Sequence, residues 1–209
     1  MMKIIAFSGL GADERVYAAL KLISEIITIP WVVPTKDETI QAYSKRLMQD
    51  IDTTSEEIVL IGVSFGGLIA TEVAKLINPT LTILISSVAT KYELPKIYRS
   101  TGGLMRFIPW WMFLPPKRMI IKLFKAENKE LLQEILKDTD PKFVKWAMTT
   151  LVRWQNTEKP SPHLKIGGDK DLLLPSKNED ILIKEGGHFM IVDKADEISH
   201  HINIQLANL

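Results

Sequence analysis

A serine flanked by glycines stands where an apolar segment changes into a helical pattern, at Gly62-Val63-Ser64-Phe65-Gly66. A serine hydroxyl is a weak nucleophile at neutral pH, so chemistry at Ser64 requires exposure, a neighbouring base and donors for an oxyanion. The apolar, mostly β-branched residues before Gly62 predict a buried central strand. The apolar spacing after Gly66 predicts a helix that ends before Pro79. The sequence therefore predicts a sharp strand-to-helix turn that presents Ser64.

Four histidines could supply the base that Ser64 needs. His188 follows Gly186-Gly187 directly after an apolar strand pattern, so a loop can present its ring at the same sheet edge as the serine. His163 precedes a strand and is expected at the opposite edge, whereas His200 and His201 fall in the final helical pattern. The positions favour His188 as the general base.

A carboxylate is also needed, because the base must be held in one tautomer and its charged form stabilised. Two acids, Asp169 and Asp171, stand in the turn that follows the strand pattern at 163–166. Either could face the histidine, and the other role for an aspartate here is to cap the turn through its own backbone.

These residues resemble the α/β-hydrolase superfamily, whose nucleophile stands in Gly-x-Ser-x-Gly between a strand and a helix and whose triad runs in the order serine, acid, histidine. The resemblance covers about residues 1–90 and 160–209. It implies that Asp171 is the acid, because Gly168 to Asp171 matches the superfamily's usual Gly-x-x-Asp pattern. Asp169 is then expected to cap the turn.

Two backbone amides are expected to hold the oxyanion. The Phe65 amide directly follows the serine at a helix start, where the helix dipole also favours an anion. The Leu10 amide lies in the glycine-containing loop after the first strand pattern. Relatives commonly have His-Gly in this loop, whereas this chain has Ser8-Gly9.

Alternating strand and helix patterns predict an α/β fold, a three-layer αβα sandwich around a mostly parallel sheet of about six strands. The strand patterns cover 3–7, 25–33, 58–61, 81–86, 163–166 and 180–184. Only helical patterns occur between about 92 and 156. We therefore expect a core domain of residues 1–90 and 158–209 and a helical cap of residues 91–157, inserted after the strand ending near Ser86 and placed over the carboxyl edge of the sheet, where the sites of α/β proteins lie.

The most apolar local stretch lies in this expected cap, from Ile108 to Pro116. Its Trp110, Trp111 and Phe113 could form the wall of an acyl pocket, or pack the cap against the core. Near the end of the last cap helix, Arg153 and Trp154 could meet a substrate carboxylate or ring, although a surface arginine and a core tryptophan are the commoner roles.

Composition excludes several classes of function. The 209 residues carry a net charge of +1, which gives no reason to expect nucleic acid as a partner. The chain has no cysteine, so disulfides and thiolate chemistry are excluded. The apolar run from Met1 to Phe7 is too short for a signal-peptide core. We expect a soluble, cytoplasmic protein without metal, cofactor or stable membrane insertion; its oligomeric state is left open.

The residues together indicate a serine hydrolase that cleaves an ester or other acyl substrate by way of an acyl-enzyme. In this interpretation Ser64 attacks, His188 moves the proton and Asp171 orients His188. Two alternatives stay open: a thioesterase or lyase that uses the same triad, and a binding protein that keeps the fold without turnover.

Overall fold

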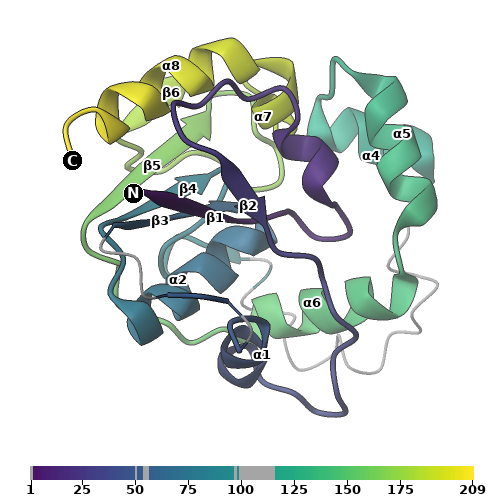
Figure 1. The fold of residues 1–209 in the computed structure, drawn as a ribbon. Helices are drawn as coiled ribbons and strands as arrows, with labels where there is room; N and C mark the ends of the chain where they lie inside the picture. The colour runs from purple at the N-terminus through teal and green to yellow at the C-terminus, as the bar shows by residue number, and fades with distance from the viewer. Residues whose placement is uncertain (1, 50, 54–56, 97, 99–115) are drawn as a thin grey trace.

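A six-stranded sheet forms the centre of the molecule, in the order β2-β1-β3-β4-β5-β6, with every pairing parallel (Figure 1). The computed structural model describes residues 2–49, 51–53, 57–96, 98 and 116–209. The strands are β1 (Lys3–Phe7), β2 (Ile26–Thr28), β3 (Ile58–Val63), β4 (Leu81–Ile85), β5 (His163–Gly168) and β6 (Ile181–Ile183). The prediction of a mostly parallel sheet of about six strands is confirmed.

Helices cover both faces of this sheet. Figure 1 shows α8 (Ala195–Leu206) on one face and α1 (Ile40–Leu47) with α2 (Phe65–Ile77) on the other. The remaining helices are the 3-10 turn η1 (Glu14–Tyr17), α4 (Lys117–Phe124), α5 (Lys129–Asp138), α6 (Pro141–Arg153) and α7 (Met190–Asp193). The expected three-layer αβα arrangement is therefore present.

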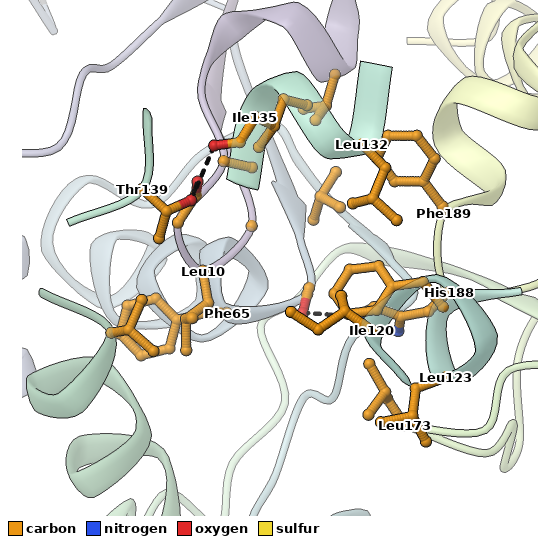
Figure 2. Close-up of a pocket in the computed structure, with 18 of the residues that line it drawn as sticks. Leu10, Phe65, Ile120, Leu123, Leu132, Ile135, Thr139, Leu173, His188 and Phe189 are labelled. Carbon is orange, nitrogen blue, oxygen red and sulfur yellow. Dashed lines mark hydrogen bonds between the residues drawn. The ribbon is translucent and has the colours of Figure 1, made fainter. Parts of the chain in front are cut away.

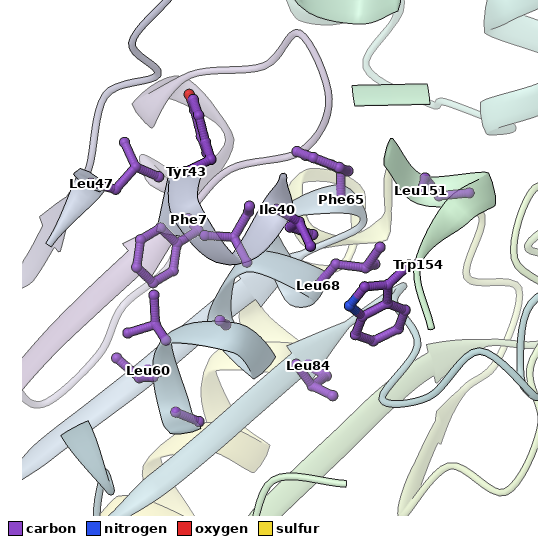
Figure 3. Packing of buried hydrophobic residues seen from close by; sticks show 14 of the residues in the cluster. Phe7, Ile40, Tyr43, Leu47, Leu60, Phe65, Leu68, Leu84, Leu151 and Trp154 are labelled. Carbon is purple, nitrogen blue, oxygen red and sulfur yellow. The ribbon is translucent and has the colours of Figure 1, made fainter. Parts of the chain in front are cut away.

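Side chains alternate between two hydrophobic cores because successive strand residues point to opposite faces. Ile5, Phe7 and Leu60 pack with residues of α1, α2 and α6, part of which Figure 3 shows. Ile4, Ala6 and Ile61 pack on the opposite face, with residues of α8. Because both faces are covered, all six residues of β3 and all five of β4 are buried.

The strand predicted over 25–33 is much shorter in the structure. Only Ile26, Ile27 and Thr28 pair with β1. One more ladder-like bond, from the Ile29 amide to the Ala6 carbonyl, follows at 2.9 Å. Beyond Ile29 the chain passes the carboxyl edge of the sheet, where the Trp31 indole donates to the Gly9 carbonyl.

The apolar spacing of Val16, Ala19, Leu20 and Ile23 predicts a helix after Asp13, but only η1 forms there. Asp13 does cap it, accepting from the Arg15 amide as expected. Beyond η1, the amides of Lys21 and Ile23 donate to the side chains of Ser199 and Asn203 in α8. Tertiary hydrogen bonds thus replace the helical ones that the apolar spacing suggested.

The chain between β4 and β5 contributes α4, α5 and α6, and no strand occurs there in the residues that the structure describes. The pair Asp140-Pro141 is typical of a helix start, and Asp140 does cap α6 through the Lys142 amide, with Pro141 in the first turn. Trp110, Trp111 and Phe113 lie outside the described residues. The boundaries of a separate cap domain at 91 and 157 stay a prediction.

Trp154 packs in the core beside α2. Its side chain is buried, and its Nε1–H donates to Glu72 Oε1 at 2.7 Å (Figure 3 shows its packing). Arg153, one residue earlier, is exposed. The commoner roles of a core tryptophan and a surface arginine therefore describe both residues.

We predict that Trp154→Phe lowers the free energy of unfolding by about 1–3 kcal/mol, because the buried Glu72 carboxylate loses a hydrogen-bond donor. Arg153→Ala is the matched control at the adjacent exposed position, and is expected to change stability by no more than about 0.5 kcal/mol. Urea denaturation monitored by circular dichroism measures both. Equal losses in the two variants would contradict the role given to the Trp154–Glu72 bond.

Candidate active site

Ser64 stands between β3 and α2 with a positive φ of 52° and a ψ of −119°, a conformation that residues other than glycine rarely adopt. The turn is tight on both sides. A Cβ atom at Gly62 would lie 2.4 Å from the Gly67 Cα, and one at Gly66 would lie 2.1 Å from the Phe7 carbonyl oxygen. Any side chain at these two positions would push the helix away from the sheet, so the glycine spacing is a steric requirement of the turn.

The structure brings Ser64, His188 and Asp171 into one hydrogen-bonded chain. His188 Nε2 lies 2.8 Å from Ser64 Oγ, and His188 Nδ1 lies 2.7 Å from Asp171 Oδ2. A carboxylate oxygen accepts, so Nδ1 carries the hydrogen and Nε2 is left to accept from the serine hydroxyl. The His188 and Asp171 side chains are buried, whereas Ser64 is partly exposed.

Asp171 is fixed by its own loop, which follows β5. Its second oxygen, Oδ1, accepts from the amides of Leu173 and Leu174, both at 2.9 Å. The carboxylate therefore has one oxygen held by the backbone and the other facing His188. Asp169 contacts neither Ser64 nor His188; its nearest cationic partner is Lys170 at 3.9 Å.

Residues at and just after the end of α4 contact His188 and the loop that carries it. The Phe124 ring, at the end of α4, meets the imidazole edge-on with ring centroids 5.1 Å apart. The Phe189 amide donates to the Phe124 carbonyl at 3.4 Å. Asp193 in α7 accepts from the Glu127 and Asn128 amides, which ties the start of α5 to the same region. The segment between β4 and β5 thus packs directly on the histidine loop.

A partly open cavity of about 430 Å³ lies beside Ser64 and His188 (Figure 2). Its walls come from the sheet edge and from α4, α5 and α6. The described lining residues are predominantly apolar, and none is charged apart from the titratable His188: they include Leu10, Ile120, Leu123, Leu132, Ile135, Leu136, Val144, Met148, Leu151, Leu173 and Phe189. The cavity is suited to a hydrocarbon group attached to a reacting centre near Ser64.

The hydroxyl of Tyr98 is affected by the negative charge of Asp171. Burial raises the pKa of the Tyr98 hydroxyl, and the negative charge of Asp171 raises it further. Tyr98 also lines the cavity. The Asp171 carboxylate is therefore close enough to disfavour a second negative charge on that wall.

Leu10 and Phe65, whose amides the sequence assigned to an oxyanion hole, both line the cavity beside Ser64. Within the described residues, no hydrogen bond to the protein uses either amide hydrogen. An ideal Cβ on Gly9 would lie 3.6 Å from Ser64 Cβ, so the loop after β1 packs against the serine. The Ser8 hydroxyl donates within this loop to the Ala12 carbonyl at 2.8 Å.

The other predicted pocket residues are not part of this cavity as described. Arg153 and Trp154 do not line it, and Trp110, Trp111 and Phe113 lie outside the described residues. The residues of α4 to α6 that do line it were missed as site residues, although their amphipathic spacing marked them as buried. Leu173 and Phe189 had one usable signal, since each stands within two residues of a predicted triad member.

Among the described residues, no group of three or more His, Asp or Glu side chains could hold a metal ion. None of the helices found in that part of the chain is long and apolar enough to cross a membrane. The cytoplasmic location expected from the sequence stays a prediction.

The arrangement of sheet and helices is that of known α/β-hydrolases. A thermophilic esterase superposes with a TM-score of 0.72 at 16% identity, covering 99% of this chain and 90% of the esterase. A lipase-esterase related protein from Clostridium acetobutylicum superposes with a TM-score of 0.69 at 17% identity, covering 96% and 93%. A meta-cleavage product hydrolase from Pseudomonas fluorescens gives 0.70 at 12%, covering 100% and 91%.

No protein-family model matches the sequence, and no curated protein matches it. Each superposition nevertheless covers most of this chain and most of the known structure. The chain therefore has the α/β-hydrolase fold, as the resemblance in its sequence implied.

We predict that Asp171→Asn slows the reaction of Ser64 with a fluorophosphonate probe on the order of 10⁴-fold, as the same change does in other Ser-His-Asp sites. The Leu173 and Leu174 amides donate hydrogen bonds, so the oxygen of the new asparagine side chain is expected to face them. Its NH₂ group then faces His188 Nδ1, which leaves the hydrogen on Nε2 and removes the acceptor for the serine proton. Labelling rates measured by intact-protein mass spectrometry test this.

Asp169→Asn is the control for Asp171→Asn, because it changes the other acid of the same turn without touching His188. It is expected to label at the wild-type rate. A larger loss in Asp169→Asn than in Asp171→Asn would reverse the assignment of the acid.

Proposed function

We propose that this protein is a serine hydrolase that cleaves esters through an acyl-enzyme. One observation carries the proposal: the hydrogen-bonded chain from Asp171 through His188 to Ser64 ends at a predominantly apolar cavity. The names of the structural neighbours, among them esterases and a lipase-esterase related protein, support it. A small-molecule acyl substrate and no cofactor are part of the same proposal.

The reaction has two halves. Ser64 Oγ attacks the substrate carbonyl carbon while its proton passes to His188 Nε2, and the tetrahedral oxyanion lies between the Leu10 and Phe65 amides. Collapse breaks the bond to the alkoxide, which takes the proton from His188. Water then attacks the acyl-Ser64 carbonyl, gives a proton to His188 and releases the acid, and the proton returns to Ser64. Asp171 orients the ring and stabilises its charged form throughout.

The cavity limits the chemistry of the substrate. Its described lining offers no cationic side chain and few polar groups. Burying a carboxylate without a partner is strongly unfavourable, whereas burying methylene groups is favourable at about 0.8 kcal/mol each. The proposed acyl group is therefore an uncharged hydrocarbon chain.

We expect the wild-type protein to hydrolyse p-nitrophenyl acetate and butyrate, measured by release of p-nitrophenolate. Ser64→Ala is expected to abolish turnover, and His188→Ala to lower kcat by several orders of magnitude, because nucleophile and base act as a unit. His200→Ala is the matched control: it removes an exposed histidine of α8 and is expected to leave kcat unchanged.

Circular dichroism shows whether each of these variants is folded. Undiminished turnover in folded Ser64→Ala would refute the proposed site. A folded wild-type protein without turnover on either ester would refute the proposed function and favour a binding protein.

The acyl preference has its own test. At equal chain length, p-nitrophenyl butyrate is expected to exceed p-nitrophenyl hemisuccinate in kcat/KM by at least about tenfold, because the terminal carboxylate of the succinyl group would be buried unpaired. Comparable kcat/KM values for the two esters would contradict the apolar acyl site while leaving the triad intact.

A further inference from the structure

The two amides proposed to hold the oxyanion belong to peptide groups whose carbonyl oxygens are engaged from behind. The Leu10 amide shares a peptide plane with the Gly9 carbonyl, and the Phe65 amide shares one with the Ser64 carbonyl. In a planar trans peptide the C=O and N–H bonds point in opposite directions. Whatever fixes the carbonyl therefore also fixes the direction of the amide hydrogen.

Two donors hold the Gly9 carbonyl. The Ala12 amide donates to it at 3.0 Å and closes a local turn. The indole Nε1–H of Trp31 donates to the same oxygen at 3.2 Å, from a segment 22 residues away in the chain. The first bond shapes the loop, and the second attaches it to the rest of the molecule.

The Ser64 carbonyl also accepts from two donors, one local and one distant in the chain. The Gly67 amide donates to it at 3.0 Å, again closing a turn. The Ser87 hydroxyl, just after β4, donates to it at 2.6 Å. A Cβ atom at Gly67 would lie 2.1 Å from Ser87 Oγ, so the glycine leaves the space that the hydroxyl occupies.

The Trp31 ring is itself held in place. It packs against Phe143 and Phe65, with ring centroids 5.3 and 5.9 Å apart, and against Tyr43 at 6.3 Å. The Trp31 ring packs on Phe65, and its indole N–H donates to the Gly9 carbonyl. One side chain therefore contacts a residue of each peptide group that supplies an oxyanion amide. An anion site works best when its donors are oriented before the charge develops.

We propose that Trp31 and Ser87 are positioning residues that orient the Leu10 and Phe65 amides toward the oxyanion. Neither side chain lines the cavity, so each acts through the peptide whose carbonyl it holds. The proposal rests on the proposed hydrolase function, since it concerns the transition state of that reaction.

The chain offers a matched control for each residue. Trp146 belongs to the same aromatic cluster, and its Nε1–H donates at 3.0 Å to the Glu38 carbonyl instead of to a site peptide. Ser199 is a buried serine of α8 whose hydroxyl donates to the Ala195 carbonyl at 2.6 Å. Trp31→Phe and Trp146→Phe each lose one indole donor, and Ser87→Ala and Ser199→Ala each lose one buried hydroxyl.

We expect Trp31→Phe and Ser87→Ala to lower kcat for p-nitrophenyl acetate about 10- to 100-fold with KM little changed, because misplaced donors weaken binding of the transition state only. Trp146→Phe and Ser199→Ala are expected to keep the wild-type kcat at a similar loss of thermal stability. A purely structural role would instead make the effects on kcat follow the loss of stability in all four variants.

A second readout does not need turnover. Amide hydrogen exchange, read by NMR, is expected to speed up at Ala12 in Trp31→Phe and at Gly67 in Ser87→Ala, because these amides share the released carbonyls. An active wild-type protein whose Trp31→Phe and Ser87→Ala variants match their controls in kcat would overturn the inference. An inactive wild-type protein would refute the proposed function, and unchanged exchange at Ala12 and Gly67 would then overturn the inference independently.

Discussion

The positive φ of Ser64 is the constraint on which the rest of the site depends. A non-glycine residue in such a conformation costs on the order of 1–3 kcal/mol and persists only where the surroundings over-determine it. Here the Ser64 amide donates to the Ile85 carbonyl at the end of β4, while its carbonyl accepts from Gly67 and Ser87. The neighbouring strand and the helix start together hold the turn, and the side chain is left to face the sheet edge.

The parallel sheet explains why the other two members of the triad arrive at the same place. Asp171 follows β5 and His188 follows β6, and parallel strands deliver the loops after their carboxyl ends to one edge. Gly66 adds the loop after β1, because its missing side chain lets α2 lie against the Phe7 carbonyl. The backbone geometry of the sheet and its loops thus brings four separate segments to the same edge.

The sequence could predict the parts of the site that are encoded locally. The glycines around Ser64 and the pair before His188 are short patterns whose backbone consequences are known, so the triad residues and both cavity-lining amides could be named. Trp31 and Ser87 have no such pattern. Their importance comes from contacts across the fold, with Gly9 and Ser64, and the Trp31 stretch looked like the continuation of a strand because its residues are apolar. Sequence reasoning could not foresee that the bonds to β1 end at Ile29.

The cavity escaped prediction for a different reason. Its walls come from α4, α5 and α6, whose apolar faces pack partly on the core and partly around empty space, and periodicity alone cannot separate the two environments. Trp154 and Leu151 illustrate this, since they stand three residues apart and only Leu151 lines the cavity.

The contrast between the sheet edge and the cavity walls also limits what similar folds can say about the substrate. At 12–17% identity, the likeness to the neighbours shows the fold of this chain. The walls of the cavity depend on the side chains of α4, α5 and α6, which the fold alone does not fix. In the proposed enzyme the reaction would therefore be set by the sheet edge and the choice of acyl group by α4 to α6, so the substrate has to be inferred from this chain's own cavity.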